Sequence, residues 1–194
     1  DPSLRSCLEP ALEEGALSAS CFPRLGELRR EIRAAEARIR STLDDLDLEP
    51  QGYGLLTLHR PANVDDPDIL RGLFGALAEI HRELPIIFPV HPRTAAVIEA
   101  QLGGVKPGLV MTEPLGYLDF LRLMADARLV LTDSGGIQEE STVLGVDCLT
   151  LRENTERPVT VTEGTNTVVG TDPAVILSET RKILAGTRAP ARIP

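Results

Sequence analysis

The sequence predicts an α/β fold in which a parallel β-sheet carries helices on both faces. From Tyr53 onward, short apolar segments alternate with longer segments whose apolar residues recur at helical spacing. At this spacing the alternation implies parallel strands joined by right-handed connections. We therefore expect a doubly wound parallel sheet.

The first fifty residues differ from the rest of the chain. Residues 1–24 hold short apolar clusters broken by prolines and show no strand pattern. Residues 25–46 carry apolar residues at helical spacing with Arg and Glu between them, which predicts an amphipathic helix that ends before Pro50 and Gly52. We expect residues 1–50 to be an irregular start and a linker helix, and residues 51–194 to be the sheet domain.

Within the sheet domain, the apolar segments predict strands and the periodic segments predict helices. The predicted strands are 54–58, 85–90, 108–112, 129–131 and 147–151, with a weaker extended segment at 167–169. The predicted helices are 68–84, 92–101, 117–127, 137–144 and 173–184. Asp66 and Pro67 favour the start of the first of these helices.

The segment that joins strand 129–131 to helix 137–144 suggests an anion site. It consists of turn or cap residues and then of residues with almost no side chain, in the order Thr132, Asp133, Ser134, Gly135 and Gly136. Such a turn leaves backbone N–H groups unpaired at the positive end of a helix, which suits a phosphate or diphosphate. A plain tight turn explains the glycines equally well, so the turn alone leaves both interpretations open.

Helix 137–144 has two expected faces. Ile137, Val143 and Leu144 are apolar and are predicted to form its inner face. Glu140 lies about one and a half turns into the helix, where its carboxylate could accept hydrogen bonds from the two hydroxyls of a ribose. Glu139 is predicted to be a solvated helix residue.

Polar residues follow most of the predicted strands, at the edge where ligands of parallel sheets lie. They are His59 and Arg60, His91, Thr112 and Glu113, Asp133 and Ser134, and segment 152–158. One His at a strand end is usually a hydrogen-bonded loop residue. Several such groups on one edge favour a diphosphate site, because Arg donates two parallel hydrogen bonds to phosphate and His titrates near neutral pH.

Composition limits the class of function. Of 194 residues, 42% are apolar and 25% charged, which is typical of a globular protein. The net charge of −9 argues against nucleic acid and membrane as partners, and no apolar run has the length of a membrane span. The three cysteines show no metal-ligand spacing. We expect a cytoplasmic protein with no metal site.

Four motifs follow one another along the chain: TLHRPANVD at 57–65, PVHP at 89–92, DSGGIQEE at 133–140 and NTERP at 154–158. In this order they resemble the non-hydrolysing UDP-N-acetylglucosamine 2-epimerases, over roughly residues 28–188. The resemblance implies the Rossmann-like carboxyl-terminal half of a glycosyltransferase-B-type fold, in which two domains face each other across a cleft. It also implies isomerisation of UDP-N-acetylglucosamine to UDP-N-acetylmannosamine by elimination and re-addition of UDP, with no cofactor.

Position by position, the resemblance implies roles for single residues. It implies that His59 is catalytic and that the substrate-binding residues are Arg60, Leu115, Phe120, Ser134, Gly135, Gly136, Glu140 and Arg157. Within this set, the turn at Ser134 would hold the diphosphate, Glu140 the ribose, and Phe120 with the backbone near Leu115 the uracil. His91 matches a position near a regulatory substrate site in some members. Phe120 as a core residue and His91 as a structural residue remain alternatives.

The resemblance extends to only part of the family's pattern. The family's amino-terminal domain, which supplies the carboxylates assigned to proton transfer, is not recognisable in residues 1–24. We therefore expect a nucleotide-binding half that binds UDP or UDP-N-acetylglucosamine, is inactive alone, and forms a homodimer or associates with an amino-terminal half. A UDP-sugar-dependent glycosyltransferase half and a non-catalytic UDP-sugar-binding module are the alternatives.

Overall fold

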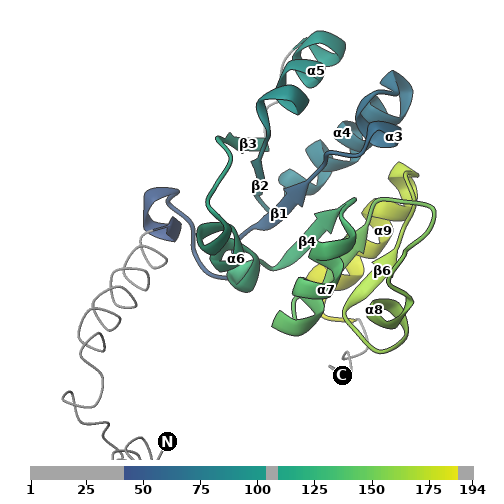
Figure 1. Cartoon of the computed structure of the whole chain (residues 1–194). Helices are drawn as coiled ribbons and strands as arrows, with labels where there is room; N and C mark the ends of the chain where they lie inside the picture. The colour runs from purple at the N-terminus through teal and green to yellow at the C-terminus, as the bar shows by residue number, and fades with distance from the viewer. Residues whose placement is uncertain (1–41, 104–108, 188–194) are drawn as a thin grey trace, which may run out of the picture. The chain divides into compact units, whose positions relative to one another are not determined.

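Six parallel strands form one sheet in the computed structural model, which describes residues 42–103 and 109–187. They are β1 (Gly54–Thr57), β2 (Ile86–Pro89), β3 (Leu109–Thr112), β4 (Leu129–Thr132), β5 (Cys148–Thr150) and β6 (Asn166–Val168). Their spatial order is β3-β2-β1-β4-β5-β6 (Figure 1). The predicted α/β fold is confirmed, and every strand ends within one residue of its predicted bounds.

The helices fill the connections between these strands. They are α3 (Pro61–Val64), α4 (Pro67–His81), α5 (Pro92–Leu102), α6 (Tyr117–Asp126), α7 (Gly135–Leu144), α8 (Pro158–Thr162) and α9 (Pro173–Leu184). Asp66 caps α4 by accepting from the N–H groups of Asp68 and Ile69, and Asp172 caps α9 by accepting from Ala174. None of the helices in the described ranges is long and apolar enough to cross a membrane.

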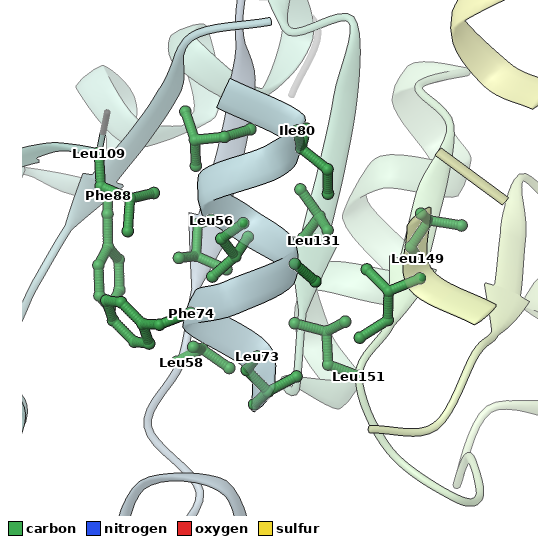
Figure 2. Packing of buried hydrophobic residues seen from close by; sticks show 14 of the residues in the cluster. Leu56, Leu58, Leu73, Phe74, Ile80, Phe88, Leu109, Leu131, Leu149 and Leu151 are labelled. Atoms are coloured by element: carbon green, nitrogen blue, oxygen red, sulfur yellow. The ribbon is translucent and has the colours of Figure 1, made fainter. Parts of the chain in front are cut away.

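The two faces of the sheet carry separate apolar clusters, because successive strand residues point to opposite faces. In β1, Leu56 belongs to the cluster shared with α4 and α9, whereas Leu55 belongs to the cluster shared with α6. Figure 2 shows the first cluster, in which Phe74 of α4 lies among strand side chains that include Phe88 and Leu131. Burial of each such side chain contributes about 1.5–3 kcal/mol to folding.

Residues 42–48 cover part of the second face. Residues 42–45 are helical, and Leu43, Leu46 and Leu48 pack against the same cluster as α6. Most of the predicted helix 25–46 lies outside the described residues. The predicted division at residue 50 stays a prediction.

The strand order places a crevice next to β1. From β1 the chain builds outward through β2 to β3, and then returns to place β4 on the other side of β1 (Figure 1). The two central strands pair from Gly54 with Leu129 to Thr57 with Thr132, so that they end level with each other. Such a reversal in strand order is where open α/β sheets bind ligands, beyond the carboxyl ends of the strands.

One predicted helix ends early, and two short helices were not predicted. Helix α4 ends at His81, not at residue 84, although Leu84 is still buried in the apolar cluster. The short helices α3 and α8 were not predicted. Both begin with a proline and have only a few residues, so they lack the apolar periodicity that marks a longer helix.

The inner face of α7 also differs from its prediction. The helix begins at Gly135, with Ser134 as N-cap, and Ile137 packs against the α6 cluster as expected. The predicted burial of Val143 and Leu144 was wrong, because these side chains are 75% and 36% exposed.

Polar residues take the buried positions of α7 instead. Gln138, Ser141 and Thr142 are buried there. The Oε1 atom of Gln138 accepts hydrogen bonds from Thr155 Oγ1 at 2.5 Å and from Asn166 Nδ2 at 3.3 Å. These bonds attach α7 to β6 and to the segment before α8, and they satisfy groups that would otherwise be buried without partners.

Candidate functional site

The buried carboxylate of Asp133 ties together the strand ends at the crevice. It follows β4 directly and is fully buried. Its Oδ2 atom accepts from the backbone N–H groups of Arg60 at 2.9 Å and His59 at 3.0 Å, and from Asn63 Nδ2 at 3.3 Å. Asn63 Nδ2 also donates to the carbonyl oxygen of Leu151, which follows β5, at 2.9 Å. The loop after β1 is thus held against β4 and β5.

The imidazole of His59 completes this arrangement. Its Nδ1 lies 2.9 Å from Oδ1 of Asp133, while 55% of the side chain is exposed. The hydrogen bond to Asp133 raises the pKa of His59 against the opposing effect of burial. Burial favours a higher pKa for Asp133, but hydrogen bonds from His59 and from the backbone of Arg60 hold that pKa below its ordinary value.

Next to the His59–Asp133 pair, α7 begins with residues that have small side chains or none. The N–H of Ser134 donates to Thr132 Oγ1 at 3.0 Å, so Thr132, predicted to be a turn or cap residue, is the last residue of β4 and also anchors the turn. The Ser134 side chain makes no capping hydrogen bond. Gly135 and Gly136 form the first positions of the helix, whose initial N–H groups have no intrahelical acceptors.

Gly135 is buried, but a side chain added there would meet few atoms. A Cβ atom added there would meet only Oε2 of Glu156, at 3.6 Å, within 4 Å. The Glu156 side chain is 55% exposed, and its other oxygen, Oε1, accepts from Arg152 at 3.0 Å. An anion can therefore approach the backbone closely at this position, which is the geometry that a phosphate at a helix start requires.

Glu140 and the aromatic residues of α6 face the same region. The hydroxyl of Tyr117 donates to Glu140 Oε1 at 3.4 Å, which joins the start of α6 to α7. Phe120 and Leu115 are partly buried and pack against the apolar cluster beneath α6. Phe120 therefore has a core contact in this structure, and its contact with uracil stays a prediction.

Arginine side chains near the crevice are paired with carboxylates. Arg152 donates to Glu156 at 3.0 Å, Arg60 lies 3.7 Å from the same carboxylate, and Arg157 pairs with Glu139 at 2.9 Å. The hydrogen bond from Arg152 holds the pKa of Glu156 below its ordinary value. The pairs of Arg60 and Arg157 are partly exposed and contribute little to stability, so these two arginines can exchange a carboxylate for a ligand phosphate at small cost.

Cavities of the described residues lie on both sides of α3. One of about 400 Å³ is lined by residues that include Arg60, Asn63 and Arg152, and one of about 60 Å³ is bordered by His59 and Arg93. A surface hollow of about 530 Å³ along α9 contains none of these residues, so volume alone does not mark the site.

His91 lies apart from the Ser134 turn. It is the N-cap of α5, after β2, and its Nδ1 accepts from the N–H of Arg93 at 3.3 Å. Strand β1 separates β2 from β4. The capping bond fits the structural alternative for His91, and its regulatory role stays a prediction.

Comparison with known proteins identifies the family. The sequence profile described as UDP-N-acetylglucosamine 2-epimerase matches residues 23–193, which is most of the chain. The chain belongs to the UDP-N-acetylglucosamine 2-epimerase family.

Curated relatives and solved structures agree with this assignment. The chain is 44% identical, over 70% of its length and 39% of the relative's, to the UDP-N-acetylglucosamine 2-epimerase of Methanococcus maripaludis. It is 42% identical, over 70% of its length and 38% of the relative's, to a UDP-2,3-diacetamido-2,3-dideoxy-D-glucuronate 2-epimerase of Pseudomonas aeruginosa. The chain thus spans about two fifths of the length of these relatives.

A structure of the Methanocaldococcus jannaschii UDP-GlcNAc 2-epimerase in complex with UDP-GlcNAc and UDP shares the fold. It superposes with a TM-score of 0.72 at 36% identity, over 84% of this chain and 46% of that one. Within the 2-epimerase family, the described domain therefore corresponds to somewhat less than half of the epimerase chain.

Sequence analysis did not predict the hydrogen bond between Asp133 and His59. Asp133 was interpreted as a turn or cap residue, although it was also placed at the same sheet edge as His59. The missing information was the strand order, which makes β1 and β4 neighbours. A signal did exist: an acidic residue at one strand end and a His at another, both followed by turn residues, fits a hydrogen-bonded pair.

Proposed function

We propose that this chain is the nucleotide-binding half of a UDP-N-acetylglucosamine 2-epimerase, that it binds UDP and UDP-N-acetylglucosamine, and that it is inactive alone. The observation that carries the proposal is the His59–Asp133 pair beside the open start of α7 at Gly135. A histidine and the helix start to which we assign the diphosphate thereby lie at the same edge of the sheet.

The start of α7 is assigned to the diphosphate. Elimination of UDP places negative charge on the departing diphosphate, so donors aimed at it stabilise the transition state more than the ground state. The N–H groups of Gly135 and Gly136, the hydroxyl of Ser134, and Arg157 at the start of α8 are the donors that the proposal uses. His59 is assigned to proton transfer beside the sugar.

Glu140 is assigned to the ribose and the region of Phe120 to the uracil. Glu140 lies five residues after Gly135, about 7.5 Å farther along α7, and a carboxylate there can accept from two neighbouring hydroxyls. Its near contact with Tyr117 at 3.4 Å is exposed and weak enough for ribose hydroxyls to replace it.

Calorimetry with UDP tests this proposal. We expect measurable but weak binding by the chain, because the proposed nucleotide-binding half supplies only one wall of the cleft. Glu140→Ala should weaken binding by about 1–3 kcal/mol, the effect of losing a charged hydrogen-bond acceptor. Glu79→Ala removes an exposed carboxylate from α4, outside the site, and serves as the matched control. Equal affinity of the wild type and Glu140→Ala would remove Glu140 from the site.

A further inference from the structure

The surroundings of Asp133 determine which nitrogen of His59 carries a proton. An ionised carboxylate only accepts hydrogen bonds, so the nitrogen that lies 2.9 Å from Oδ1, Nδ1 of His59, must be the donor. In the neutral ring, Nε2 is then the acceptor. No group in the described ranges forms a hydrogen bond with Nε2, and more than half of the side chain is exposed.

The carboxylate itself is held in one orientation. Three donors converge on Oδ2, namely the backbone N–H groups of His59 and Arg60 and the side-chain amide of Asn63. Oδ1 faces the imidazole and also accepts a longer hydrogen bond, of 3.3 Å, from the N–H of His59. Because Asp133 is fully buried and its neighbours belong to two strand ends and α3, it cannot turn without breaking several hydrogen bonds.

We propose that Asp133 is a positioning residue that holds His59 in the Nδ1-protonated form and directs Nε2 outward as the reactive nitrogen. This inference rests on the proposed function of His59 in proton transfer. In the neutral ring, Nε2 can take a proton from a substrate group, and in the imidazolium it can return that proton to an oxygen of the sugar or of the diphosphate. Asp133 keeps its own charge throughout and never contacts the substrate.

The charged groups around His59 fit this arrangement. Asp133, at the junction of β4 and α7, raises the pKa of His59. Arg60, the next residue along the loop that carries the imidazole, lowers it. Asp65 after α3 and Arg93 on α5 line the small cavity that His59 borders. The net effect is a raised pKa for His59.

Nitrogen-15 NMR of the imidazole rings in the full chain tests the proposal without any ligand. The nitrogen shifts of neutral histidine distinguish the two tautomers, and a pH titration gives the pKa of each ring. In the wild type, we expect His59 to be Nδ1-protonated when neutral and to have a raised pKa. A wild-type His59 with the opposite tautomer would overturn the proposal, whatever the variants do.

Asp133→Asn gives the decisive contrast. The three donors at Oδ2 favour the amide oxygen there, which turns the NH₂ group toward Nδ1 of His59 and makes Nδ1 the acceptor. We expect the neutral tautomer to switch to Nε2-protonated and the pKa of His59 to fall. Asp172→Asn makes the same chemical change at the N-cap of α9, where Asn caps equally well, and should leave His59 unchanged.

The outcomes separate the inference from the proposed function. If a folded Asp133→Asn protein keeps the wild-type tautomer and pKa of His59, Asp133 does not position the ring. If the tautomer switches in Asp133→Asn but the wild-type chain fails to bind UDP in calorimetry, the proposed function is wrong. The pairing of Asp133 with His59 then still holds.

Discussion

At the scale of single residues, the hydrogen bond between His59 and Asp133 makes stability depend on pH. Because the pKa of His59 is raised above 6.5 in the folded chain, its contribution is fully present below pH 6.5 and is lost as the pH rises through the folded pKa. The pKa of Asp133 is lowered from 3.8, so its contribution is present above pH 3.8 and is lost as the pH falls through the folded pKa.

Urea denaturation at about pH 5.5 and about pH 8 checks this dependence. We expect the wild type to lose more stability than His59→Asn between the two values. The difference should stay near or below about 1 kcal/mol, because the imidazole of His59 is 55% exposed and solvent screens its interaction with Asp133. If the free energy of unfolding of His59→Asn changes with pH as in the wild type, the pair makes no contribution to the pH dependence of stability.

Two glycines of the site region should respond to added side chains in opposite ways. At Gly135 a Cβ has room, whereas at Gly164 it would lie 2.6 Å from both Thr142 Oγ1 and the carbonyl oxygen of Thr160. We expect Gly135→Val to keep the fold and abolish UDP binding, and Gly164→Ala to destabilise the chain by about 1–3 kcal/mol. Thermal melts followed by circular dichroism, with calorimetry for UDP, measure both. Global unfolding of Gly135→Val would favour a purely structural turn.

At the scale of elements, α7 is attached to the domain by polar contacts on its inner face. Removing Gln138 as acceptor leaves the hydroxyl of Thr155 without its acceptor and takes one of two hydrogen bonds from Asn166 Nδ2, so Gln138→Ala should destabilise the fold by about 1–3 kcal/mol. Val143→Ala changes a side chain that is 75% exposed and should stay within about 0.5 kcal/mol of the wild type. Urea midpoints that rank these variants in the reverse order would contradict the polar attachment of α7.

The inner strands β1, β2, β4 and β5 were predictable because each is a short, mostly apolar run whose two faces are both buried. In β4, every residue from Leu129 to Thr132 is buried, which is typical of a central parallel strand. Helix α7 was harder, since Val143 and Leu144 on its exposed side are apolar, whereas three of its buried residues, Gln138, Ser141 and Thr142, are polar. Hydrophobic periodicity assumes the opposite arrangement, and so it assigned Val143 to the wrong face.

At the scale of the whole molecule, the chain by itself should not epimerise UDP-N-acetylglucosamine. Inversion at C2 requires one group to remove a proton and another to deliver one from the opposite face. Among the described residues, His59 is the group that we place beside the sugar. One imidazole on one wall of the cleft cannot reach both faces of C2. The chain also spans only 46% of the Methanocaldococcus jannaschii epimerase.

Proton NMR of UDP-N-acetylglucosamine in deuterated water measures this directly. We expect neither deuterium at C2 nor the manno epimer with the purified chain, while the Methanocaldococcus jannaschii epimerase, assayed in parallel, should give both. Steady exchange by the chain that disappears in His59→Ala would show that it holds a complete catalytic set. Addition of an amino-terminal half of a related epimerase should restore turnover if the two halves dock.

The sequence by itself determined the parallel α/β fold, the strand positions and the family, because these depend on local apolar runs and on motifs that are contiguous in the chain. The tertiary structure alone decided which strand ends meet. The pairing of β1 with β4 brings Asp133 to His59 across 74 positions of sequence, and it explains why an apparent turn residue is a fully buried acceptor. Contacts of this kind depend on strand order, which no local pattern encodes.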